Sequence, residues 1–216
     1  MSVPTRSVFV VDDASEVRVS LARMLGAAGY DVEVFESAEK YLDRQEAEGP
    51  GCLLLDVCMP GLSGLELQSA LSHTSQRPIV FLSGHGDIAT SVRAMKAGAV
   101  DFLTKPVDPP RLFAAVEQAL RRDDTERLER TVRQKIEQRL EGLTRRERQV
   151  MERVISGGLN KQIAASLGTA EKTVKVHRGR MMAKMGARSV AELVRIVARA
   201  GFPMELPTRR RNFPET

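Results

Sequence analysis

The sequence contains little cysteine. Its two cysteines, Cys52 and Cys58, lie six positions apart, with no histidine or further cysteine near them. A disulfide framework or a zinc site needs several such ligands at regular, close spacing. The pattern therefore argues against both kinds of site and favours two free thiols in a reducing compartment.

The sequence also lacks a long apolar run. No stretch approaches the ~18 consecutive apolar residues of a transmembrane helix. The first residues, MSVPTRSVFVVDD, hold a short apolar run that ends in acid and has no small-residue cleavage site, which argues against a signal peptide. We expect a cytoplasmic protein with no membrane partner.

Acidic and basic side chains are unevenly divided along the chain. Residues 1–120 carry 10 Lys+Arg and 16 Asp+Glu, a net charge of −6, whereas residues 121–216 carry 23 and 12, a net charge of +11. This asymmetry predicts two domains with different partners, the basic one facing a polyanion. A cationic surface that serves only solubility is the alternative.

Five short apolar runs in the first half alternate with stretches of helical spacing. The runs occupy 8–11, 32–35, 52–57, 79–82 and 100–103. The helical stretches occupy 17–25, 65–71, 88–99 and 112–120. Strands that alternate with helices predict an α/β fold, a doubly wound parallel sheet of five strands covered on both faces.

The second half has no strand pattern. Residues 121–141 are highly charged, and four aliphatic residues recur every fourth position, which predicts an exposed linker helix rather than a flexible linker. Two capping boxes, which start at Thr144 and Ser189, and a predicted helix cap at Asn160 after Gly157–Gly158 then divide the rest into four helices, at 145–156, 160–167, 171–185 and 189–200. The tail from Pro203 holds three prolines and is predicted to be disordered.

Reactive polar side chains follow four of the five predicted strands. They are Asp12 and Asp13, Asp56, Ser83 and Lys105. A doubly wound sheet gathers the carboxyl ends of its strands at one edge, where ligands bind. Three crowded carboxylates need a cation, and an all-oxygen site suits Mg²⁺. One carboxylate can then attack phosphorus, while the ammonium and hydroxyl groups stabilise the phosphoryl oxygens. Taken singly, each residue has a plainer explanation as a helix cap, turn former or solvated side chain.

The segments VVDD, LLLDVCMPGLSGLEL, FLSGHGD and AGAVDFLTKP resemble the receiver domain of bacterial response regulators. The resemblance implies a flavodoxin-like sheet of order 2-1-3-4-5 and a cis Lys105–Pro106 bond. It implies that Asp56 accepts a phosphoryl group from a sensor histidine kinase. The implied roles of the other residues are Mg²⁺ binding by Asp12, Asp13, Asp56 and the Cys58 carbonyl, phosphoryl contact by Ser83 and Lys105, and an aromatic switch at Phe102.

Two positions depart from the usual pattern of this family. Cys58 stands where many relatives have arginine, which alters a side chain beside the pocket but leaves the carbonyl available for metal. Ser83 replaces the commoner threonine and keeps the hydroxyl group.

The run from Leu143 to Ser189 resembles the LuxR-type helix-turn-helix of NarL/FixJ regulators. Helical spacing predicts a buried stripe that includes His177 and an opposite face that meets DNA. The candidate contacts to double-stranded promoter DNA are Lys172, Thr173, Lys175, Val176 and Arg180. Gly179 stands where the family usually has a basic residue, so we expect sequence preference to rest more on Lys175 and Val176. The last helix is implied to form part of a dimer interface, or else it only closes the core.

The predicted domains are a receiver at 6–121, a helical linker at 122–139, a C-terminal all-α helix-turn-helix domain at 140–202 and a tail at 203–216. The predicted function is a phosphorylation-dependent transcriptional regulator that forms a homodimer when phosphorylated, and not a metabolic enzyme. The main alternative is a phosphate sink or a protein that binds DNA regardless of phosphorylation. A Mg²⁺-dependent phosphohydrolase is the third possibility. Such enzymes generally carry a second acid two residues after the nucleophile, and here that residue is Cys58.

Overall fold

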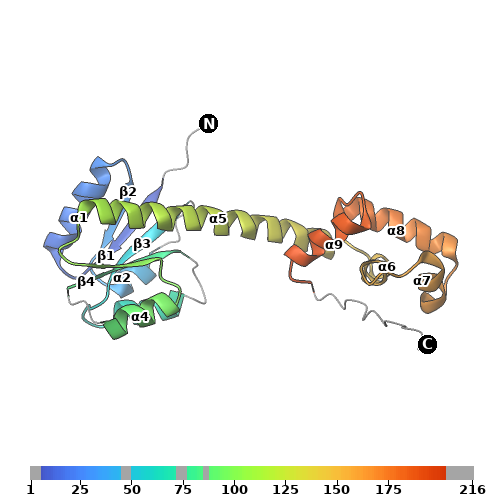
Figure 1. Cartoon of the computed structure of the whole chain (residues 1–216), viewed down its shortest axis with the longest axis horizontal. Coiled ribbons are helices and arrows are strands. Elements are labelled where there is room, and N and C mark those ends of the chain that lie inside the picture. Colours follow the sequence, from blue (N-terminus) through green and yellow to red (C-terminus); the bar gives the residue numbers. More distant parts are fainter. Residues whose placement is uncertain (1–5, 45–49, 72–76, 85–87, 203–216) are drawn as a thin grey trace, which may run out of the picture. The chain divides into compact units, whose positions relative to one another are not determined.

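The protein divides into two compact units, Met1–Leu128 and Glu129–Thr216. The computed structural model describes residues 6–44, 50–71, 77–84 and 88–202. The predicted tail from Pro203 lies outside these described residues. The helices and strands are shown in Figure 1.

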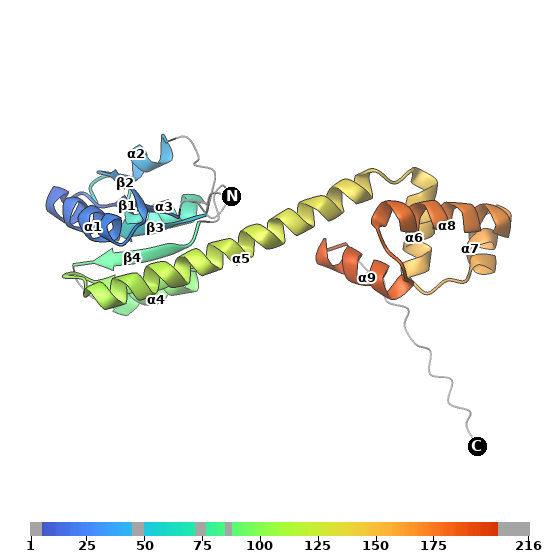
Figure 2. The ribbon, with the colours of Figure 1, turned by 90° about the horizontal axis from the view of Figure 1, so that it is seen from above.

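The first unit is built on a five-stranded parallel sheet. The strands are β1 (Ser7–Val11), β2 (Asp31–Phe35), β3 (Gly51–Asp56), β4 (Ile79–Ser83) and β5 (Asp101–Thr104). Their order is β2-β1-β3-β4-β5, with all neighbours parallel, which confirms the predicted fold class. Figure 2 shows β3 and β4 side by side. The order reverses between β1 and β3, and in doubly wound sheets ligands bind beyond the carboxyl ends of the strands at such a reversal.

Alternate residues of the central strands face opposite sides of the sheet. Val8, Val10 and Leu54 pack beneath α1 (Ser15–Ala27) and the first turns of α5 (Pro109–Glu141). The residues between them belong to a second cluster, which contains side chains of the three remaining helices. These helices are α2 (Ala38–Leu42), α3 (Gly64–Leu71) and α4 (Ile88–Lys96). Figure 1 shows α5 and α4 on opposite sides of the sheet. The central strands are thus buried on both faces, which explains why their sequences are continuously apolar.

The structure contains one helix that the sequence pattern did not predict and one that it did. The short helix α2 was not predicted, although Ser37 caps it by accepting a hydrogen bond from the Lys40 amide at 3.3 Å. The charged stretch after the receiver pattern is helical, as expected, because α5 continues to Glu141. Its early turns pack in the first unit, whereas Ile136 and Leu140 belong to the core of the second unit.

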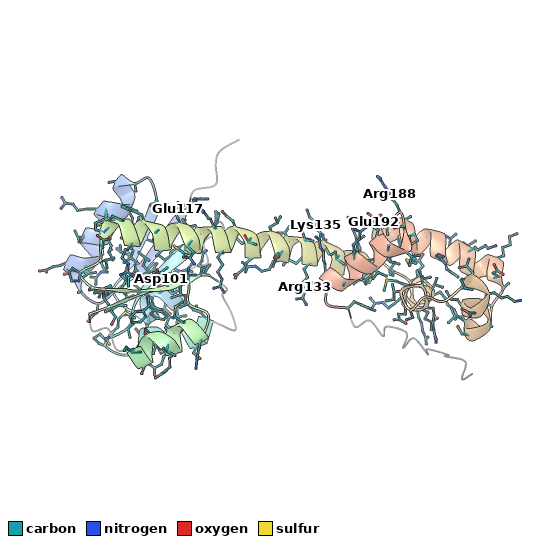
Figure 3. The ribbon with its side chains drawn as sticks, viewed as in Figure 1. Asp101, Glu117, Arg133, Lys135, Arg188 and Glu192 are labelled. Atoms are coloured by element: carbon teal, nitrogen blue, oxygen red, sulfur yellow. The ribbon has the colours of Figure 1, made fainter. Side chains whose placement is uncertain are left out.

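In the second unit, the residues described up to 202 form helices and the turns between them. Its helices after α5 are α6 (Arg145–Ile155), α7 (Asn160–Leu167), α8 (Glu171–Met185) and α9 (Val190–Arg199), within a residue or two of the predicted bounds. Thr144 and Ser189 cap their helices as predicted: Thr144 accepts from the Glu147 amide at 3.3 Å, and Ser189 accepts from the Glu192 amide at 3.1 Å. The predicted cap at Asn160 is wrong, because Asn160 is the first residue of α7 and Leu159 is the N-cap residue. Figure 3 labels Glu192, whose carboxylate also accepts from the Arg188 amide at 2.8 Å.

Candidate functional site

Three carboxylates meet at the carboxyl ends of β1 and β3. Asp12 and Asp13 follow β1, Asp56 ends β3, and one oxygen of each lies within 4.8 Å of the other two. Asp12 and Asp56 are buried, whereas Asp13 is exposed. The gathering of these acids, expected from the sheet topology, is therefore present. Their oxygen-only donor set and partly exposed position suit a hard divalent cation that retains water.

Lys105 joins two of the three acids. Its Nζ lies 2.6 Å from Asp12 Oδ2 and 3.1 Å from Asp56 Oδ2. The residue follows β5, and its peptide bond to Pro106 is cis, as the resemblance implies. The Lys105 amide donates to the Ser83 carbonyl at 2.7 Å, which ties this loop to the end of β4. One cation thus partly neutralises the cluster from the β5 side.

Burial and the neighbouring charges have opposite effects on the pKa values of Asp56 and Lys105. Burial raises the pKa of Asp56 above its usual value, and the nearby Lys105 only partly offsets that effect. For Lys105, burial acts to lower the pKa, but the hydrogen bond to Asp12 and the charge of Asp56 outweigh it and raise the pKa. An ionised Asp56 is therefore poorly solvated, and a poorly solvated carboxylate is a better nucleophile than one fully hydrated by water.

The remaining predicted pocket residues lie at or near the same edge. Ser83 ends β4 and is buried. Phe102, on β5, is partly buried, with its ring centroid 6.3 Å from that of Phe81. The side chain of Cys58 is exposed, two residues beyond Asp56. The carboxyl-end edge of the sheet thus carries three carboxylates, the ammonium group of Lys105 and the residue Ser83.

Three residues that support the pocket were not singled out from the sequence. Arg18, on α1, donates to the carbonyls of Asp12 at 2.6 Å and Asp13 at 2.9 Å. Glu39, on α2, accepts from the Leu62 amide at 3.0 Å and so holds the loop after Asp56. A side chain at Gly64 would clash with the Asp56 carbonyl oxygen. Gly64 could have been found, because it lies in the MPGLSGLEL segment; Arg18 and Glu39 carry no comparable signal.

A second candidate site lies on α8. The helix follows α7 after a turn at Gly168, which has a left-handed φ of 61° and ends α7. Val174, Met181 and Met185 face the core. The five candidate DNA contacts on the remaining surface are all exposed: Lys172, Thr173, Lys175, Val176 and Arg180.

Hydrogen bonding connects the two helices of this motif. Arg178 Nη1 donates to Asn160 Oδ1 at 2.8 Å and links α8 to the start of α7. His177 is partly buried, in agreement with the packing role expected for it rather than with base contact. Lys175 pairs with Glu171 at 3.4 Å, an exposed contact that a competing phosphate can displace.

Among the described residues, no helix combines the length and apolar character needed to cross a membrane.

Comparison with known proteins connects both sites to characterised families. Residues 8–117 match the response regulator receiver domain, and residues 141–197 match the luxR family of bacterial regulatory proteins. The transcriptional regulatory protein FixJ of Bradyrhizobium diazoefficiens is 43% identical over 90% of this chain and 95% of its own length. The response regulator protein TodT of Pseudomonas putida is 40% identical over 92% of this chain and 88% of its own.

Solved structures give the same assignment. The response regulator StyR is 48% identical, with a TM-score of 0.79 over 90% of this chain and 98% of StyR. Full-length FixJ from B. japonicum is 42% identical, with a TM-score of 0.55 over 91% of this chain and 98% of FixJ. The chain therefore belongs to the NarL/FixJ-type response regulators, the transcriptional regulators that join a receiver domain to a LuxR-type DNA-binding domain.

Proposed function

We propose that Asp56 is the phosphoryl acceptor and that its phosphorylation controls DNA binding by α8. The observation that carries the proposal is the position of Asp56, buried at a strand end and in contact with Lys105 inside a cluster of acids. An Asp56 oxygen attacks the phosphorus of a phosphohistidine on a sensor histidine kinase. The N–P bond breaks as the O–P bond forms, and the phosphoryl group moves to the aspartate.

Asp12, Asp13, Asp56 and the Cys58 carbonyl are the proposed holders of Mg²⁺. The bound ion supplies charge neutralisation for the phosphoryl oxygens. The chain's own groups do the rest. Lys105, which already touches Asp56, neutralises a further phosphoryl oxygen, and Ser83 donates a hydrogen bond from the end of β4. Movement of Ser83 towards the phosphoryl group allows Phe102 to turn inward.

The proposed output is dimerisation through α4. Three large apolar side chains of this helix, Ile88, Val92 and Met95, are 78%, 43% and 44% exposed. Their spacing places them along one face of the helix. A contiguous exposed apolar face of this kind marks an interaction surface. Pairing of two receivers brings two LuxR-type domains to paired half-sites on promoter DNA. The expected cytoplasmic location and the homodimer are parts of this proposal.

A mass measurement tests the acceptor. The protein is incubated with Mg²⁺ and acetyl phosphate and weighed intact, and we expect the mass of one phosphoryl group to be added. Asp56→Asn should add none, and EDTA should abolish the gain in the wild type. Equal phosphorylation of Asp56→Asn would place the acceptor elsewhere.

The alternatives give different results. A phosphate sink or an always-active binder would bind promoter DNA equally with and without acetyl phosphate. A phosphohydrolase would turn over a generic phosphate ester many times per protein molecule. The contact of Lys105 with Asp56 favours the acceptor role over a merely structural aspartate.

A further inference from the structure

The side chain of Arg18 is bonded to the backbone of both acids that follow β1. Its Nη1 donates to the Asp12 carbonyl at 2.6 Å and to the Asp13 carbonyl at 2.9 Å, and the side chain is partly buried. Arg18 is the fourth residue of α1, near the positive end of the helix dipole, where a cation is unfavourable. The two hydrogen bonds to the carbonyls compensate for this unfavourable position.

The two cations beside the acid cluster bond different atoms of it. Lys105 Nζ contacts carboxylate oxygens of Asp12 and Asp56, which are atoms of the proposed Mg²⁺ site. Arg18 contacts the carbonyl oxygens of the turn, so its hydrogen bonds leave the carboxylate oxygens open to an ion. A bound ion would therefore compete with Lys105 for oxygen atoms, whereas Arg18 can keep its bonds while the ion is present.

The two acids of the turn differ in how their side chains are held. The Asp12 amide donates to the Phe35 carbonyl at 3.2 Å, and Asp12 Oδ1 accepts from the Ala14 amide at 3.0 Å. The Asp13 side chain is exposed, so its direction depends on how the backbone of the turn is held. Arg18 holds that backbone, because two successive carbonyls point at one nitrogen. A turn that is ordered before the ion arrives loses less backbone freedom on binding.

We propose that Arg18 is a positioning residue for Mg²⁺, which fixes the turn so that the Asp13 carboxylate stays close to those of Asp12 and Asp56. This inference rests on the proposed Mg²⁺ site. Groups that hold metal ligands in place commonly affect metal affinity strongly. The charge of Arg18 alone would act in the opposite direction, because a cation near the site repels a divalent ion.

The substitution Arg18→Met separates positioning from charge. Methionine keeps an unbranched apolar side chain but removes both the hydrogen bonds and the positive charge. If Arg18 acted only through its charge, the loss of repulsion would tighten Mg²⁺ binding. If Arg18 positions Asp13, Mg²⁺ binding should weaken instead.

The experiment titrates the full-length protein with Mg²⁺ by isothermal titration calorimetry. Arg18→Met should raise the dissociation constant for Mg²⁺ about tenfold or more. In the acetyl phosphate mass assay, the Mg²⁺ concentration that gives half the maximal rate should rise by the same factor. The rate at saturating Mg²⁺ should match that of the wild type, which a variant with a misfolded pocket would not achieve.

Arg23→Met is the matched control. Arg23 lies on the same helix and is exposed, and its substitution removes the same charge from α1. This variant should bind Mg²⁺ as the wild type does.

The outcomes distinguish this inference from the proposed function. Three results would each overturn the positioning role while the proposed Mg²⁺ site stood: equal or tighter Mg²⁺ binding in Arg18→Met, a phosphorylation rate that stays low at saturating Mg²⁺, or an equal loss of affinity in Arg23→Met. A wild-type protein that binds no Mg²⁺ would overturn the metal site itself, and this inference with it.

Discussion

The surroundings of Asp56 disfavour the ionised form of its carboxyl group. Burial raises the pKa of this carboxyl above its ordinary value of 3.8. Between the unfolded and folded pKa values the folded state binds more protons, so stability falls as pH rises through that interval, and the full cost remains at neutral pH. We therefore expect Asp56→Asn, in metal-free buffer, to melt a few degrees higher than the wild type at pH 7. The difference should shrink as pH falls through the raised folded pKa towards 3.8, and it should be absent below 3.8. Melting curves across pH check this, and a lower melting temperature for Asp56→Asn at pH 7 would contradict it.

Gly64 supports the backbone of the acceptor. An added Cβ would clash with the Asp56 carbonyl oxygen and lie 3.2 Å from Leu55 Cγ. Gly64→Ala should destabilise the receiver by about 1–3 kcal/mol, as overpacking does, and slow phosphorylation by acetyl phosphate. Urea unfolding and the mass assay measure the two effects, with Gly26→Ala as the control that has room for its methyl group. Wild-type stability and rate in Gly64→Ala would show that the loop adapts at no cost.

At the scale of single residues, the sequence reveals the reactive side chains of the site better than the residues that hold them in place. Asp12, Asp13, Asp56, Ser83 and Lys105 could be found because each stands at the end of an apolar strand run, a position that the topology brings to one edge. Their individual roles in phosphorylation stay predictions. Arg18 and Glu39 act through backbone groups of other segments, and such contacts depend on three-dimensional placement that no local pattern encodes.

The start of α6 is stabilised by a buried carboxylate. Glu147 is 3% exposed, accepts from the Thr144 amide at 2.9 Å and lies 2.7 Å from Lys184 Nζ on α8. The hydrogen bond from Lys184, followed by that from the Thr144 backbone, lowers the pKa of Glu147 below its ordinary value of 4.5. A lowered folded pKa contributes stability that is present above the unfolded pKa and is lost as pH falls through the folded pKa.

Glu147→Gln should therefore lower the melting temperature of the second unit at pH 7. The gap to the wild type should close as the solution is acidified below pH 4.5. Calorimetry at several pH values tests this. A difference in melting temperature that stayed constant at all pH values would mean that the charge of the Glu147 carboxylate does not stabilise the fold. Thr144→Ala is a useful companion, since loss of an N-cap costs about 1 kcal/mol at neutral pH.

At the scale of elements, long periodic segments were predictable and a short one was not. The second-unit helices were found because capping residues mark their starts and apolar residues recur along them. The helix α2 has five residues, too few for a periodic pattern to emerge, and it is held by packing of Ala38 and Tyr41 against the sheet. Propensity cannot reveal a helix whose stability comes from tertiary contacts.

At the scale of the whole molecule, the exposed face of α4 makes dimerisation testable. Val92→Glu places a charge in the middle of that apolar face, so the acetyl phosphate-treated variant should stay monomeric in sedimentation experiments while its phosphorylation remains intact. Val19→Glu is the control, because Val19 is 58% exposed on α1, away from this face. If phosphorylated Val92→Glu dimerised like the wild type, another surface would have to mediate the pairing.

The charge asymmetry of the chain predicts a salt effect. The residues from 121 onward carry the excess of Lys and Arg, and binding to DNA releases counterions from the phosphates that they neutralise. Arg180→Gln should weaken binding to all duplexes alike and reduce the slope of log K against log salt by about 0.9 if the residue contacts one phosphate. Fluorescence anisotropy over a salt series measures this slope, and an unchanged slope would remove Arg180 from the phosphate contacts. The acidic and basic halves were evident from composition alone, whereas the predicted domain boundaries stay predictions.

The buried Asp123 on α5 has a practical meaning for anyone who wishes to express the receiver alone. This side chain is 1% exposed and accepts a hydrogen bond from the Gly51 amide at 2.9 Å, and its neighbour Asp124 pairs with Arg6 at 3.4 Å. In a fragment that ends at residue 121, the Gly51 amide at the start of β3 would lose its hydrogen-bond acceptor. Fragments meant for crystallisation, or for fusion to a foreign effector, should therefore keep the chain at least through Asp124.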